Sequence, residues 1–137
     1  AMMKRHVLGV MCAAILTASP SWALETMSSV QLLTNVTTTA TGGRYSPRCV
    51  NRTFQAMGAT SAGSGASAII IEASDKADPA EATAVDWTTL GTITLTLGTT
   101  QTNDGFVSYA SWRWVRARVS SISGTGATVN AYLGCGS

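Results

Sequence analysis

The stretch Thr92-Ile93-Thr94-Leu95-Thr96-Leu97 decides the fold class, because aliphatic side chains alternate with threonine without a break. Successive side chains of a β-strand point to opposite faces, so this pattern gives a strand one aliphatic face and one hydroxyl face. An aliphatic face must be covered by a second layer of structure. The stretch therefore predicts a half-buried strand in a layered β-protein.

The same two-residue period recurs on both sides of this stretch. It is clear at Ala127, Val129, Ala131 and Leu133, and again at Val115, Ala117 and Val119. The run Ala68-Ile69-Ile70-Ile71 is apolar throughout, which is typical of a central strand covered on both faces. Shorter patterns predict three more strands: one anchored by Val50, Phe54 and Ala56, one over 30–36 and one over 106–109. The total is about seven strands.

Turn-forming residues separate these patterns, and they include the glycine-rich segments 58–65 and 123–126. Their spacing is that of a sandwich. We interpret 58–65 as a hairpin loop and the acidic segment 75–86 as a helical turn or a long loop. The sequence thus predicts an all-β fold, a single antiparallel β-sandwich of jelly-roll or Ig-like type, over residues 24–137.

The first 23 residues differ from the rest. Lys4, Arg5 and His6 precede an apolar run over 7–18, and small residues follow at Ser21 and Ala23, which is the order of a secretory signal. The apolar run is shorter than the ~20 residues of a membrane-spanning helix. We expect 1–23 to be a signal segment, with Ala1 an added residue and no membrane anchor in the mature form. The alternative is an N-terminal helix that is retained.

Removing 1–23 leaves seven Lys and Arg residues against seven Asp and Glu residues, so the mature chain is neutral. A neutral domain lacks the positive field on which sequence-independent nucleic-acid binding depends, so we expect no nucleic-acid partner. Two cysteines remain, Cys49 and Cys135. In an exported chain such a pair predicts one disulfide. In a reducing compartment both would be free thiols.

Catalytic chemistry is hard to find in this sequence. His6 is the only histidine and lies in the signal-like segment, so the mature chain has no imidazole for acid–base work or metal binding. No phosphate-binding glycine motif and no zinc-spaced cysteine pair occur. The candidates for a catalytic carboxylate pair are acidic residues in loops, with no reason to converge: Asp75, Asp78, Glu81, Asp86 and Asp104. We expect no enzyme, no cofactor and no assigned metal.

The most unusual segment runs from Tyr109 to Val119 and contains Trp112 and Trp114. If Val115, Ala117 and Val119 point inward, the side chains of Trp114, Arg116 and Arg118 share the opposite face. Trp and Arg are favoured anchors of protein interfaces, and an indole also stacks on sugar rings. The sequence predicts a binding surface made of five residues: Tyr109, Trp112, Trp114, Arg116 and Arg118. In the alternative interpretation, Trp114 covers the sandwich edge and the arginines pair with acidic residues of neighbouring strands. Trp87 is expected in the core.

Several segments resemble short β-sandwich accessory or decoration proteins of bacteriophage capsids and tails. The resemblance spans roughly residues 48–133, through 52–56, 87–95, 104–106, 114–117 and 122–129. It implies a non-enzymatic structural subunit displayed on a particle in several copies, and its expected protein partner is another copy of itself or a larger assembly. The location would be the virion, or the periplasm or exterior if the signal is genuine. The alternative function is an exported bacterial module that binds carbohydrate or another surface.

Overall fold

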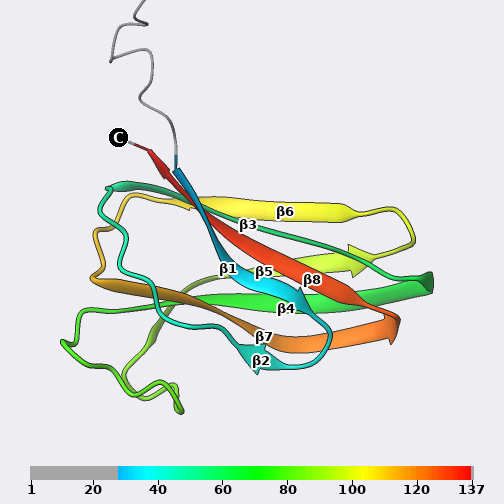
Figure 1. Cartoon of the computed structure of the whole chain (residues 1–137), viewed down its shortest axis with the longest axis horizontal. Coiled ribbons are helices and arrows are strands. Elements are labelled where there is room, and N and C mark those ends of the chain that lie inside the picture. Colours follow the sequence, from blue (N-terminus) through cyan, green and yellow to red (C-terminus); the bar gives the residue numbers. More distant parts are fainter. Residues whose placement is uncertain (1–27, 137) are drawn as a thin grey trace, which may run out of the picture.

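The computed structural model describes residues 28–136, which form two four-stranded antiparallel sheets and no helix (Figure 1). The predicted signal segment 1–23 lies outside the described residues. Among residues 28–136, no helix is long and apolar enough to cross a membrane. The strands are β1 Ser28–Val36, β2 Ala40–Thr41, β3 Asn51–Ala59, β4 Ala62–Ser74, β5 Thr88–Leu97, β6 Thr102–Ser108, β7 Trp114–Thr125 and β8 Thr128–Gly136.

The order of the strands makes this sandwich a jelly roll. One sheet has the order β1-β8-β3-β6 and the other has β2-β7-β4-β5, so only the connection from β4 to β5 joins neighbours within a sheet. Every other connection crosses between the sheets, which gives the eight-stranded double Greek key of a jelly roll. An Ig-like sandwich keeps different strand neighbours. The prediction of an antiparallel sandwich is confirmed. The structure has eight strands and not about seven, because the two-residue strand β2 was not predicted.

The core lies between the sheets and comes from the alternating patterns. Ile93, Leu95 and Leu97 of β5 are all buried, while the threonines between them are exposed. The same alternation buries Val115, Ala117 and Val119 of β7 and, on the opposite sheet, Val129, Ala131 and Leu133 of β8. Phe54 of β3 packs against Phe106 of β6 with ring centroids 5.3 Å apart. The predicted inward faces are therefore confirmed.

Three expectations need correction. Val50 does not anchor a strand: its side chain is 56% exposed, and Arg52 takes the buried position at the start of β3. Segment 58–65 is not a hairpin loop, because β3 and β4 belong to different sheets. Within the apolar run of β4, Ile69 and Ile71 are fully buried but Ile70 is only half-buried, so the outer face of that strand is partly open.

Candidate functional site

The side chains predicted to form an exposed strip on β7 do share one face of the strand, but other parts of the protein cover that face. Trp114, Arg116 and Arg118 point away from the core, as the alternation requires. Arg116, however, is only 2% exposed, so it cannot contact a partner. Arg118 retains 30% of its side-chain exposure, and Trp114 is half-buried. The exposed strip is thus corrected to a covered one, and the arginines pair with an acidic residue of the neighbouring strand.

That acidic residue is Glu72 of β4, which sequence reasoning did not single out. It is the register partner of Arg116 and is equally buried. One carboxylate oxygen, Oε1, accepts from Arg116 Nε at 3.2 Å and from Arg118 Nε at 3.1 Å. A buried carboxylate is tolerated only when it is paired and hydrogen-bonded. The two arginines therefore hold Glu72 in place, and Glu72 fixes their guanidinium groups.

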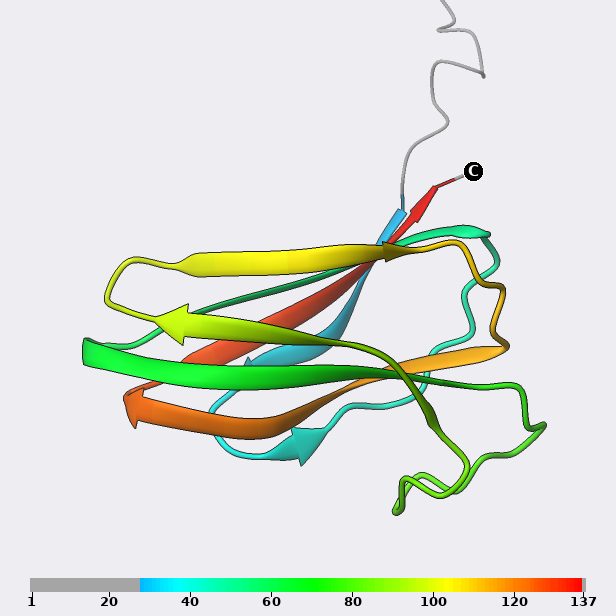
Figure 2. The same cartoon turned by 180° about the vertical axis from the view of Figure 1, so that it is seen from behind.

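The cover over Arg116 is the loop of residues 75–87, which joins β4 to β5 and folds back over the outer face of their sheet (Figure 2). Arg116 donates to the carbonyl oxygens of Glu81 at 2.9 Å and Thr83 at 3.1 Å. Its guanidinium lies 4.1 Å from the ring centroid of Trp87, which is a cation–π contact. Trp87 is buried as expected, but it packs under this loop and is not part of the inter-sheet core cluster.

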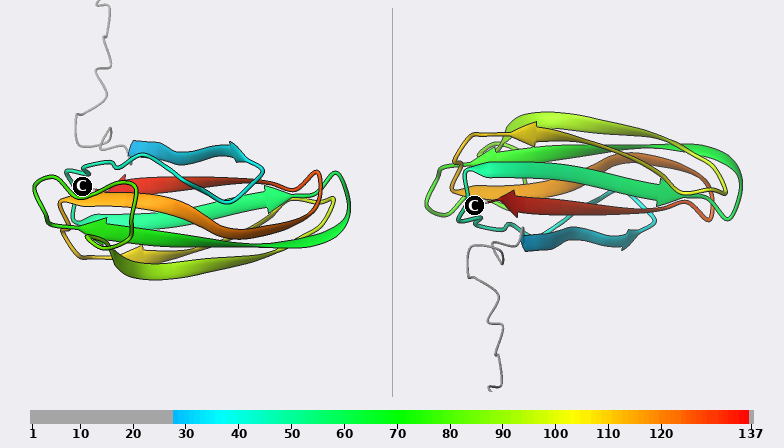
Figure 3. Two further views of the ribbon diagram at one scale, coloured as in Figure 1. Left: turned by 90° about the horizontal axis from the view of Figure 1, so that it is seen from below. Right: turned by 90° about the horizontal axis from the view of Figure 1, so that it is seen from above.

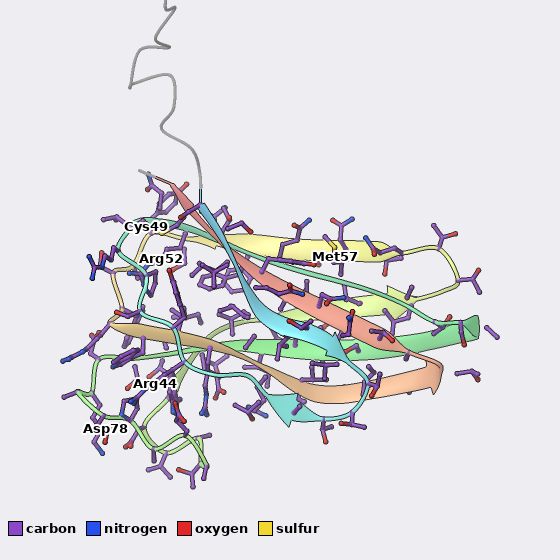
Figure 4. The ribbon with its side chains drawn as sticks, viewed as in Figure 1. Arg44, Cys49, Arg52, Met57 and Asp78 are labelled. Atoms are coloured by element: carbon purple, nitrogen blue, oxygen red, sulfur yellow. A yellow bond between two sulfur atoms is a disulfide. The ribbon has the colours of Figure 1, made fainter. Side chains whose placement is uncertain are left out.

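A second set of contacts fixes the rim of the same loop. Arg44 pairs with Asp78 at 2.9 Å and with Glu81 at 3.4 Å, and Figure 4 shows Arg44 and Asp78 near each other at this end. Its guanidinium also lies 4.5 Å from the ring centroid of Trp114. The indole Nε1 of Trp114 donates to the carbonyl oxygen of Lys76. Trp114 is therefore engaged on its ring face and at its nitrogen.

Asp86 makes hydrogen bonds within the 75–87 loop. Its Oδ2 accepts from the backbone N–H of Ala80 at 2.8 Å and from Lys76 Nζ at 3.0 Å. The backbone hydrogen bond, followed by the bond from Lys76, lowers the pKa of Asp86 below its ordinary value. The ionised form of Asp86 is thus the form that holds the loop together.

Cys49 and Cys135 form a disulfide, which confirms the predicted pair. Their Cα atoms lie 5.7 Å apart, and the bond joins the segment before β3 to the end of β8, its neighbour in the sheet. Arg52 lies beside the bond, as Figure 4 shows. It donates to three carbonyl oxygens, those of Cys49, Pro47 and Trp112. Burial lowers the pKa of Arg52, and the Asp75 carboxylate opposes that shift.

One group of exposed side chains lies at the end of the sandwich that holds the disulfide, and we call it the disulfide end: the Cys49–Cys135 bond with Tyr45, Arg48, Val50 and Tyr109. A depression of about 580 Å³ lies between Tyr45, Arg48, Val50 and the disulfide. Tyr109 follows β6 in the 109–113 connection and is 70% exposed. Of the predicted surface residues, only Tyr109 is largely free.

Trp112 differs from Tyr109 although both lie in the 109–113 connection. Its side chain is half-buried and packs against the inter-sheet core. Sequence reasoning did not find Tyr45, Arg48 and Val50 as surface residues. The sequence indicates their position only indirectly. A disulfide between Cys49 and Cys135 places the residues on either side of Cys49 near the end of β8.

The described residues do not offer a ready cofactor site. No three His, Cys, Asp or Glu side chains between residues 28 and 136 are grouped as metal ligands. In the same range every buried side-chain nitrogen and oxygen has a hydrogen-bond partner. The carboxylates of the 75–87 loop are each bonded to a cation or to a backbone amide. These contacts stabilise the 75–87 loop on the outer face of its sheet.

Comparison with protein-family models, with curated proteins and with solved structures finds no match for this chain. Function therefore has to be inferred from the geometry described above.

Proposed function

We propose that this chain is a non-enzymatic structural or decoration subunit of a phage-like particle, that it self-associates, and that it docks on the particle through its disulfide end. The observation that carries the proposal is the distribution of exposed groups. Tyr45, Val50 and Tyr109, three of the five large exposed hydrophobic side chains of the described part, lie beside the disulfide together with Arg48, and a fourth, Val85, lies in the 75–87 loop at the same end. Aromatic and arginine side chains around an apolar patch are typical of protein interfaces.

The fold and the covalent chemistry support the same function. Jelly rolls form viral capsid subunits, although a fold alone does not fix a function. The disulfide braces the docking end against deformation, and its presence favours a final location outside a reducing cytoplasm. Arg48 lies beside the depression and forms no ion pair within residues 28–136, so the partner surface is expected to be apolar with acidic groups at its rim.

The test is cofractionation with particles from a phage-producing culture of the source organism. Wild-type chain is expected to band with the particles on a density gradient. The double variant Tyr109→Ala, Arg48→Ala is expected to move to the soluble fraction, while Thr94→Ala on the outer face of β5 behaves like wild type. The proposal fails if wild type stays in the soluble fraction, or if the double variant still bands with the particles.

The second candidate function is an exported carbohydrate- or surface-binding module. It is favoured by the exposed rings of Tyr45 and Tyr109 at the disulfide end, since jelly rolls also serve as lectins and tyrosine rings stack on sugars. A glycan array distinguishes the two functions. A sugar signal that disappears in Tyr45→Ala or Tyr109→Ala supports the lectin-like module, and no signal for wild type rejects it.

A further inference from the structure

Within residues 28–136, the outer face of the β1-β8-β3-β6 sheet carries no charged side chain. These four strands contain two charged residues, Arg52 and Asp104, and each is on the side of its strand that faces the other sheet. The opposite sheet, by contrast, holds Glu72, Arg116 and Arg118 on its outer face. The uncharged face is therefore a specific property of one sheet.

Figure 3 (right) shows the strands of this sheet from above, and their register arranges the outward side chains in cross-sheet rows. The central row reads Gln31, Tyr132, Gln55, Gly105 from β1 to β6. The row on one side contains Ser29, Gly134, Thr53 and Val107, and the row on the other contains Asn130, Met57 and Asn103. The face thus combines amides, one tyrosine, one methionine and one valine.

Gly105 leaves a hollow in the central row. A depression of about 380 Å³ surrounds it, lined by Thr53, Gln55, Asn103 and Val107 among others. A Cβ atom at position 105 would clash with the carbonyl oxygen of Phe54, so glycine is required by the close approach of β3 and β6. The hollow is therefore built into the sheet.

The amides on this face are partly paired with each other. Gln31 Nε2 donates to Asn130 Oδ1 at 2.9 Å, and Gln55 Nε2 donates to Asn103 Oδ1 at 3.4 Å. This pairing orients the side chains and leaves amide donors on the asparagines and amide acceptors on the glutamines. A surface with both kinds of group and no charge is complementary to a copy of itself, since no like charges meet across a two-fold axis.

We propose that this face is a homodimer interface, occupied by the same face of a second copy. A two-fold axis parallel to the strands and midway between β8 and β3 superposes all four strands of the two sheets. It places Tyr132 over the Gln55 amide of the second copy and Gln31 over the Gly105 hollow. The area of the face follows from its four strands, which are spaced about 4.8 Å apart and rise about 3.3 Å per residue. It is roughly 500 Å² per copy and roughly 1,000 Å² for both copies. That total reaches the lower bound of a specific interface, about 1,000 Å².

The inference names the surface of the self-association that the proposed function includes, and it rests on that function for its biological role. The two are separable because the disulfide end and the β1-β8-β3-β6 face do not share residues. A chain that dimerises but does not band with particles overturns the particle role alone. A chain that bands with particles but stays monomeric in solution overturns the dimer alone.

The test is sedimentation velocity of the full chain with its disulfide intact, over a range of protein and salt concentrations. Gln55→Arg places a cation in each copy near the axis, and Thr94→Arg is the matched control at an exposed central position of β5 on the other sheet. Wild type and Thr94→Arg are expected to dimerise equally. Gln55→Arg is expected to raise the dimer Kd by about tenfold or more, through like-charge repulsion.

Two further measurements make the outcome decisive. An equimolar mixture of Gln55→Arg and Gln55→Glu is expected to recover the dimer, which excludes misfolding as the cause of the loss. The wild-type Kd is expected to change little with salt, because the face is neutral. The inference is overturned if wild type stays monomeric, if Gln55→Arg and Thr94→Arg have equal effects, or if the charge-reversed mixture does not associate.

Discussion

At the residue scale, Arg116 shows how a side chain suited to binding is used for structure. It donates to Glu72 and to two loop carbonyl oxygens, and it lies against the ring of Trp87. All of its polar contacts and its ring contact are therefore internal. The side chain connects β7, β4 and the 75–87 loop, so replacing it reports on folding and not on partner binding.

Arg116→Ala is expected to lower the free energy of unfolding by about 3 kcal/mol, because Glu72 then keeps only Arg118 in a buried site. Urea unfolding followed by tryptophan fluorescence measures the change. Arg48→Ala, an exposed arginine of the disulfide end, is the control and is expected to stay within about 0.5 kcal/mol of wild type. An Arg116→Ala variant as stable as wild type would contradict the role given to this side chain.

At the scale of elements, the 75–87 loop is the segment that sequence patterns describe least. It has no periodicity, and its path is set by contacts with residues far away in the chain, namely Arg44, Trp114 and Arg116. The structure of β5 and β8, by contrast, can be predicted from their local sequence, since the alternation of side chains alone fixes which face of each strand is buried. This is why the strands were predicted and the covering of the β7 strip was not.

Asp86→Asn tests the loop through its pH dependence. The ionised carboxylate is bound, so its stabilising contribution is present above the ordinary aspartate pKa of 3.8 and is lost as the pH falls through the lowered folded-state value. At neutral pH the Tm of Asp86→Asn is expected to lie below that of wild type, and the two Tm values are expected to converge below about pH 3.8.

Thermal unfolding across the acid range, followed by circular dichroism, measures this convergence. Asp104→Asn is the matched control, because Asp104 lies on β6 of the other sheet. A Tm difference for Asp86→Asn that does not change with pH would show that the carboxylate charge is not what holds the loop.

At the scale of the whole molecule, charge is concentrated at one end. Apart from Asp104, the charged side chains of residues 28–136 lie in the loops at the disulfide end or in the adjoining parts of β3, β4 and β7. The loops at the opposite end are made of Ser, Thr, Ala, Gly and Gln. The asymmetry was not predicted, because it depends on which connections the jelly roll brings to the same end.

The sandwich class could be predicted from the alternation of side chains. The jelly-roll topology could not, because it depends on the pairing of strands that are distant in the sequence.

The disulfide is expected to contribute to the stability of the whole molecule. It closes a loop with a sequence separation of 86 residues. In the chain-entropy description, a loop of this length corresponds to about 4.6 kcal/mol of unfolding free energy. The double variant Cys49→Ser, Cys135→Ser is expected to lose about that amount in urea unfolding. Reductant should destabilise wild type and leave the double variant unchanged, and equal sensitivity of the two would contradict the prediction.

The first residues of β4, which follow the turn from β3, offer a practical use of the end remote from the disulfide. Gly63 has a positive φ of 68°, and a Cβ atom there would meet nothing within 4 Å. Small, solvent-facing residues surround it on both sides. Peptide epitopes inserted at such a tip are tolerated when the neighbouring backbone is exposed. A tag placed there would extend away from both proposed contact surfaces, so the chain would be suited to labelling or antigen display on the particle that we propose it decorates.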